Sequence, residues 1–82
     1  MEVYILTRLD IAPDRTNSLV VDAPSARAFL SEEGARRAMR EEYDSMRRES
    51  DVEYYCDNDE AFIADDDDCG KLWSVKRAEV NP

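Results

Sequence analysis

Ten acidic residues lie between positions 49 and 68, and no lysine or arginine lies among them. The whole chain has 82 residues, with 20 acidic and 11 basic side chains and a formal net charge of −9. Outside the segment ten acids therefore face 11 bases, so the segment holds all of the excess charge. Carboxylates at this density can bind a hard cation, exchange protons in a reaction or meet a basic surface. The acids are Glu49, Asp51, Glu53, Asp57, Asp59, Glu60, Asp65, Asp66, Asp67 and Asp68.

This acidic segment is expected to be structured rather than a flexible tail. Like charges repel within a Debye length of about 8 Å at physiological salt, so concentrating them in one place costs stability. Apolar residues nevertheless alternate with the acids, which is typical of strands and not of a solvated tail. These residues are Tyr54, Tyr55, Phe62 and Ile63.

The pattern favours a surface that docks on a basic partner. Alternate residues of a strand lie about 6.6 Å apart, so Asp51, Glu53 and Asp57 could project from one face at a spacing close to that of nucleic-acid phosphates. Such a row can occupy a groove that binds phosphates, and an aromatic side chain can add apolar anchoring. The predicted contact residues are Asp51, Glu53, Tyr55, Asp57, Asp59, Glu60, Asp65, Asp66, Asp67 and Asp68.

Two other interpretations of the acidic segment stay open. The acids can form a solvated, charged strand edge that prevents aggregation, on a small structural or regulatory module that forms homo-oligomers. Alternatively, Asp57, Asp59 and the run Asp65 to Asp68 can bind Ca²⁺ or Mg²⁺ weakly through oxygen ligands. The residue order of an EF-hand is absent. A zinc site is not expected, because the chain has no histidine and only two separated cysteines.

Enzymatic activity is not expected, and neither is a cofactor. The commonest general base is missing because the chain has no histidine. The only glycines, Gly34 and Gly70, cannot form a phosphate-binding loop. Direct binding of nucleic acid is disfavoured as well, since a net charge of −9 opposes contact with phosphates.

The elements that must position these acids can be predicted from hydrophobic periodicity. We expect strands over residues 2–9, 19–21, 52–56, 61–64 and 71–80, with a loop over 11–18. The second strand is interrupted at Asp22 to Ser25 and resumes as extended chain to Leu30. The order is β-β-α-β-β-β, an α+β fold in which an antiparallel sheet of four to five strands carries one amphipathic helix on one face.

The helix is the clearest single element. Ser31 is a good N-cap, Glu32 and Glu33 suit the positive end of the helix dipole, and the helix should end near Glu49 or Ser50. An apolar stripe recurs at helical spacing and should pack on the sheet, together with Trp73 and Val75 of the last strand. The stripe consists of Ala35, Ala38, Met39, Tyr43 and Met46.

The size of the chain favours a single domain over residues 1–82. No stretch reaches the roughly 20 apolar residues of a membrane span, and the first residues lack the basic and apolar regions of a signal peptide. We therefore expect a cytoplasmic protein with no membrane partner. In that compartment Cys56 and Cys69 should be free thiols, and Gly70 should supply a positive φ to the turn before the last strand.

A very small acidic α+β chain with carboxylates on one sheet region and its turns resembles the phage-encoded inhibitors of host nucleic-acid machinery, including anti-CRISPR proteins that act as DNA mimics. The resemblance is one of general type, since these inhibitors share no signature motif. It implies an inhibitor that acts in the host cytoplasm on a basic nucleic-acid-binding protein or complex, such as a Cas effector. It also implies that Asp57, Asp59, Glu60 and Asp65 to Asp68 belong to the contact surface.

Overall fold

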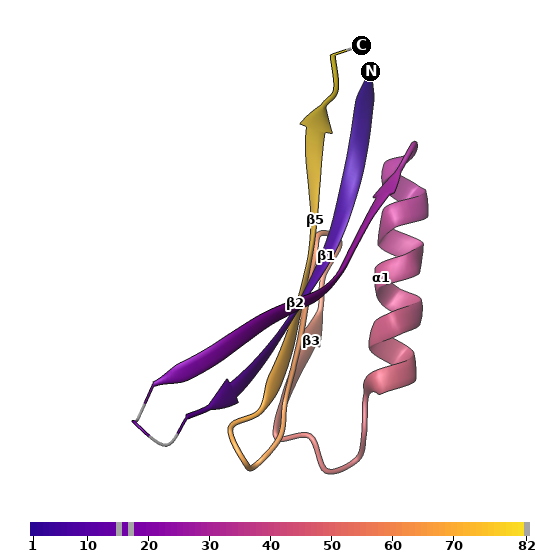
Figure 1. Cartoon of the computed structure of the whole chain (residues 1–82). Coiled ribbons are helices and arrows are strands. Elements are labelled where there is room, and N and C mark those ends of the chain that lie inside the picture. Colours follow the sequence, from indigo (N-terminus) through magenta and orange to yellow (C-terminus); the bar gives the residue numbers. More distant parts are fainter. Residues whose placement is uncertain (15, 17, 82) are drawn as a thin grey trace.

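The computed structural model describes residues 1–14, 16 and 18–81. They form one five-stranded antiparallel sheet in the order β2-β1-β5-β4-β3, with a single helix against one face (Figure 1). This confirms the predicted α+β class and element order. The elements are β1 (Glu2–Pro13), β2 (Leu19–Phe29), α1 (Glu32–Met46), β3 (Glu53–Cys56), β4 (Glu60–Ala64) and β5 (Gly70–Glu79).

The core lies between α1 and the three central strands. Trp73 of β5 is fully buried, and its ring meets Tyr43 of α1 edge to face, with centroids 6.2 Å apart. The predicted helix stripe is confirmed, because Ala35, Met39 and Tyr43 are buried and Ala38 and Met46 pack against them. The sheet contributes Leu6, Ala61, Ile63, Trp73 and Val75.

The helix begins where the sequence predicts and ends earlier. The Ser31 hydroxyl accepts a hydrogen bond from the Gly34 N–H at 3.0 Å, which is the expected N-cap. At the other end Arg47 is already extended, with φ −67° and ψ 132°. The carboxylate of Asp51 accepts from the Arg48 N–H at 2.6 Å, so a side chain replaces the next helical turn.

The first two strands are longer than predicted. β1 extends into the predicted loop as far as Pro13, and β2 runs unbroken through the predicted interruption at Asp22 to Ser25. The pairing register shifts after Arg8, so that two residues of β2, Ala23 and Pro24, lie opposite Leu9. A bulge on an edge strand tolerates proline, because no partner needs the missing N–H there.

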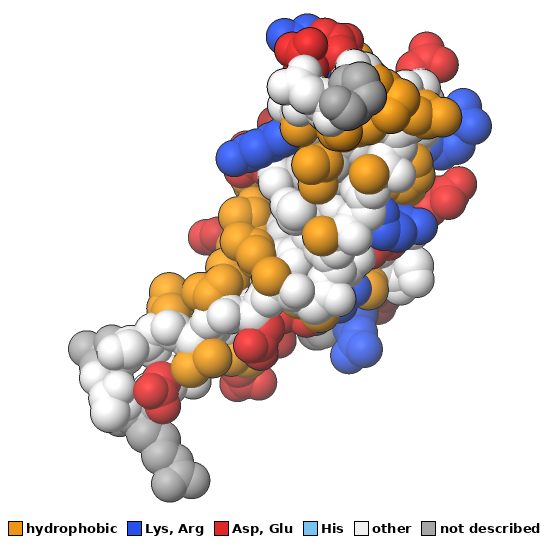
Figure 2. Space-filling view, turned by 45° about the horizontal axis from the view of Figure 1, so that its top comes forward, with side chains coloured by type: hydrophobic (Ala, Val, Ile, Leu, Met, Phe, Trp, Pro, Cys, Tyr) orange, Lys and Arg blue, Asp and Glu red, His pale blue; other side chains and the backbone are white. Residues whose placement is uncertain are grey.

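The far ends of β1 and β2 form a hairpin arm, residues 11–14 and 18–22, that bends away from the rest of the sheet (Figure 1). Pairing between β1 and β5 stops at Ile11, so beyond that point the arm is a two-stranded ribbon. Three of its side chains, Leu19, Val20 and Val21, are 46–63% exposed. Figure 2 shows hydrophobic side chains following this arm towards its tip.

The described part of the chain contains one helix, α1, which has 15 residues. None of the described helical residues forms a stretch long and apolar enough to cross a membrane. The start of β1 lies beside the end of β5, and the Met1 amino group donates to the Val80 carbonyl at 3.0 Å (Figure 1).

Candidate functional site

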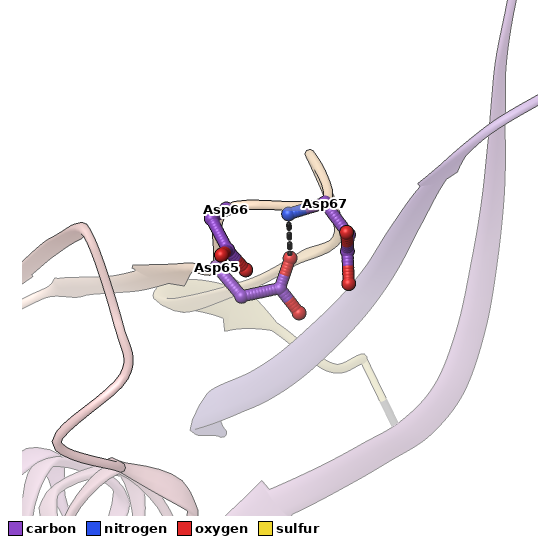
Figure 3. A group of neighbouring side chains, drawn as sticks. All are labelled: Asp65, Asp66 and Asp67. Atoms are coloured by element: carbon purple, nitrogen blue, oxygen red, sulfur yellow. Dashed lines mark hydrogen bonds between the residues drawn. The ribbon is translucent and has the colours of Figure 1, made fainter.

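The turn between β4 and β5, which we call the acidic turn, carries Asp65, Asp66, Asp67 and Asp68. One carboxylate oxygen of Asp65 accepts from the Asp67 N–H at 2.9 Å and from the Cys69 N–H at 3.1 Å (Figure 3). The Asp65 N–H donates to the Cys69 carbonyl at 2.9 Å. The turn is therefore held by its own first side chain, as aspartate does in many turns.

The positive φ predicted for Gly70 is wrong, because Asp68 has it instead. Asp68 has the positive φ, 63°, and no described glycine has one. Gly70 is instead the first residue of β5, where a Cβ would lie 3.1 Å from the Ile63 carbonyl and close to the Phe62 ring. Aspartate tolerates the left-handed conformation better than most side chains, and close packing is the reason for the glycine.

The acidic turn is exposed and uncompensated by basic side chains. Asp66, Asp67 and Asp68 are exposed, and within the described part of the chain none of the four aspartates has an ion pair. The nearest lysine in sequence, Lys71, contacts Asp10 at 3.8 Å instead. Glu53 lies beside the turn, because it pairs with Ala64 across β3 and β4, and it is also exposed.

Three of the other predicted acids, Asp57, Asp59 and Glu60, form a second group at the turn between β3 and β4. The five residues of β4 separate the two turns by about 17 Å. Two of these acids already have partners within the molecule. Asp59 accepts from Arg36 at 2.9 Å and 3.0 Å, and Glu60 accepts from the Tyr55 hydroxyl at 2.7 Å. That hydrogen bond raises the pKa of Tyr55, while Asp57 is exposed.

The row of Asp51, Glu53 and Asp57 is not formed, because β3 is only four residues long and contains Glu53 alone of the three. Asp51 lies at the end of the helix, where its side chain is 5% exposed and pairs with Arg47 at 3.2 Å. The Arg47 guanidinium lies over the Tyr54 ring, 3.4 Å from its centroid. Asp51 thus stabilises the fold locally, and its carboxylate is shielded from a docking partner.

Two acids near the acidic turn were not identified from sequence. Asp10 and Asp22 pair across β1 and β2, and both line an open groove of about 520 Å³ together with Asp51 and Asp65. Arg48 and Lys71 line the same groove and reduce its charge. A prediction of β1 and β2 as one long hairpin would have placed Asp10 opposite Asp22.

The chemistry available to the acidic turn is that of clustered oxygen atoms. One carboxylate oxygen each from Asp65, Asp66 and Asp67 can be chosen so that all three lie within 4.8 Å of one another (Figure 3). Exposed aspartates approach one another in this way in many turns without binding a metal, and here the Asp65 carboxylate already closes the turn. The arrangement presents fixed negative charge to whatever approaches from solvent.

Both cysteines are free thiols, as predicted. Burial raises the pKa of the Cys56 thiol, and the carboxylates of Asp44 and Asp57 act in the same direction against the guanidinium of Arg40. The reactive thiolate is therefore scarce near neutral pH.

In a Cys69→Ser variant at about pH 8, we expect Cys56 to react with Ellman's reagent several times more slowly in the folded chain than in urea. Equal rates would show that the thiol is not shielded.

Comparison of the chain with protein-family models, with curated protein sequences and with solved structures found no match. What the chain does must therefore be inferred from its own surfaces.

Proposed function

We propose that this protein is a non-enzymatic binding protein whose acidic turn docks on a basic, nucleic-acid-binding surface of a partner protein and blocks it. The observation that carries the proposal is the presentation of Asp66, Asp67 and Asp68. They are exposed, without an ion pair among the described residues, and held in place through the Asp65 carboxylate. A surface that only needed solubility would not require a fixed cluster that repels itself.

Electrostatics explains how such a turn would work. Fixed carboxylates attract a lysine- or arginine-rich groove over about a Debye length, which accelerates encounter. They lose little conformational entropy on binding, because the turn is already ordered by its own hydrogen bonds. Nucleic-acid phosphates and these carboxylates then compete for the same basic side chains. The partner inferred from this chemistry is a nucleic-acid-binding protein, with a Cas effector as the example that the resemblance to anti-CRISPR DNA mimics suggests.

The remaining predicted residues take graded roles in this proposal. Glu53 and Asp57 are exposed and can extend the contact near either end of β4. Glu60 and Tyr55 bind each other, and Asp59 binds Arg36, so each would have to exchange an internal partner for an external one. The acidic turn should therefore contribute more to binding than the turn between β3 and β4.

The test is a capture experiment followed by competition. The immobilised chain is exposed to lysate of its source cell, and bound basic proteins are then challenged with duplex DNA and with RNA. We expect nucleic acid to displace the captured protein, and affinity to fall steeply between about 50 mM and about 500 mM salt. Replacing all four aspartates of the acidic turn with asparagine should weaken capture at least tenfold, or about 1.4 kcal/mol.

Asparagine is the appropriate replacement because it removes charge and preserves the turn. At position 65 its side-chain oxygen still accepts from the N–H groups of residues 67 and 69, and asparagine tolerates the positive φ at position 68. The matched control E41Q/D44N/E49Q/E79Q removes the same charge from four exposed acids elsewhere and should retain capture. Equal weakening by both variants, or captured proteins that nucleic acid cannot displace, would refute docking by the acidic turn.

A further inference from the structure

The sheet face opposite α1, which we call the open face, is uncovered and largely apolar. Leu6, Trp73 and Ile63 point to the helix, so their neighbours along each strand point the other way. The pairing registers join four residues on that other side of the sheet into one row across four strands. The row runs Leu9, Leu72, Phe62, Tyr55, and the rings of its last two members lie 6.0 Å apart.

The distribution of apolar and charged residues in β1 is typical of a strand whose open-face side chains are also covered. A sheet with one face in water alternates apolar and polar residues, whereas strands covered on both faces are apolar throughout. The open-face positions of β1 include Ile5, Leu9 and Ile11, all only partly exposed. The charged residues of this strand, Glu2, Arg8 and Asp10, lie on the helix side, where Arg8 and Asp10 pair with each other at 3.1 Å. The polarity is thus the reverse of what a solvated open face requires.

The polar atoms at the centre of the open face are already satisfied. Thr7 and Ser74 are paired across β1 and β5, and their hydroxyl oxygens lie 2.8 Å apart in a hydrogen bond. Burying a hydroxyl without a partner costs about 1–3 kcal/mol, and this bond reduces that cost. The centre of the face can therefore be covered by an apolar surface.

The charge on the open face differs from that of the rest of the molecule. Among the described strand residues of this face, only Lys76, Glu53 and Glu60 are charged, and both signs are present. The acids Asp14, Asp65 and Asp68 of the adjoining loops line a groove at one end of the face, so the sparse charge belongs to the centre of the face, where a basic partner would find little to bind. A surface with the same apolar rows and the same mixed, sparse charge is complementary to it, and a second copy of the chain supplies that surface.

The area of the open face agrees with this occupant. The strands have 12, 11, 4, 5 and 10 residues. At about 3.3 Å per residue and about 4.8 Å between strands, they give a face of about 670 Å². Stable interfaces bury about 800 Å² on each partner, so nearly the whole face has to be covered, including the exposed side chains Leu19 and Val21 of the arm.

We propose that two copies of this chain pack their open faces together in a two-fold dimer, with the sheets inside and the helices outside. Two sheets then share one apolar layer, as in other face-to-face sheet packings. This interface goes beyond the proposed docking function and does not depend on it. The acidic turns project from the ends of β4 and β5, so they lie at the rim of the dimer, accessible to a partner.

The dimer is tested by analytical ultracentrifugation of the full chain. We expect twice the single-chain mass at about 100 µM protein, and dissociation on dilution. Each copy carries −9, so salt should strengthen the dimer by screening repulsion. Salt weakens acidic docking, so the two proposals fail separately. A wild-type chain that stays monomeric at this concentration in high and low salt overturns the dimer.

Substitutions locate the interface. Leu72→Glu, in the centre of the apolar row, should raise the dimer dissociation constant at least tenfold. The matched control Leu30→Glu changes an equally apolar side chain that is 79% exposed and lies outside the strands, and it should leave the constant unchanged. If circular dichroism shows that Leu72→Glu does not fold, Thr7→Arg replaces it as the test variant. A long arginine side chain can reach water on the open face of a single copy, but not between the packed faces of two copies. Unchanged dimers in a folded open-face variant, or equal dissociation by Leu30→Glu, overturn the proposed interface.

Discussion

Replacing Trp73 with alanine should lower the free energy of unfolding by about 3–5 kcal/mol. Trp73 is fully buried at the centre of β5, where it contacts α1 through Tyr43 and pairs with Ala61 of β4. A chain of 82 residues has a total stability of about 4–12 kcal/mol. The cavity therefore removes a large part of what holds the helix on the sheet, and urea unfolding followed by circular dichroism should show a much lower midpoint.

Phenylalanine at position 73 separates the volume of the side chain from its polar atom. The Trp73 indole N–H is buried and has no hydrogen-bond partner among the described residues, and such a group costs about 1–3 kcal/mol. Trp73→Phe leaves a smaller cavity and removes that cost, so it should be clearly more stable than Trp73→Ala. An alanine variant as stable as the phenylalanine variant would mean that α1 is held mainly by other contacts.

The helix and the meander of the last three strands could be predicted because their signals are local. The cap at Ser31, the apolar stripe of α1 and the alternation around Trp73 each lie within one short segment. The long β1–β2 hairpin could not be predicted in the same way. Pro24 and its neighbours are typical of a turn, and only pairing with β1 shows that a bulge accommodates them.

The acidic segment shows the same division between composition and arrangement. Its charge is evident from the sequence, whereas its separation into two turns depends on the length of β4. The internal partner of Asp59 is Arg36 of the helix, 23 residues away, so sequence neighbours did not indicate it, whereas Asp51 pairs with Arg47, which lies only four residues before it. The open face was not recognised because the sheet order β2-β1-β5-β4-β3 is needed to bring Leu9, Leu72 and Phe62 into one row.

The two proposed surfaces meet at one end of the open face, where Asp65 and Asp68 line a groove together with Phe62. Asp66, Asp67 and Asp68 belong to a turn beyond the end of the strands, while Leu72 and Phe62 lie on the open face. Glu53 and Tyr55 can contribute to either surface, since they are on the open face of β3, an edge strand that begins beside the acidic turn. A dimer would bring two acidic turns to a single assembly, so a partner with two basic sites could bind it with higher effective affinity.

The carboxylate of Asp51 should be required for stability rather than for docking. It pairs with Arg47 at 3.2 Å and accepts from the Arg48 N–H at 2.6 Å, with its side chain only 5% exposed. Hydrogen bonds to a charged group contribute about 1.5–3 kcal/mol, so Asp51→Ala should lower the free energy of unfolding by about 2 kcal/mol. Urea denaturation of the single variant measures this loss.

Asp57→Ala is the matched control, because it removes the same charge from an exposed residue with no ion pair among those described. Its stability should stay within about 0.5 kcal/mol of the wild type. In the capture experiment the two variants should rank the other way. Folded Asp51→Ala should bind the partner as the wild type does, and Asp57→Ala should bind it equally well or slightly less well. If Asp51→Ala keeps full stability but loses capture, Asp51 belongs to the docking surface, and the helix end must open to expose it.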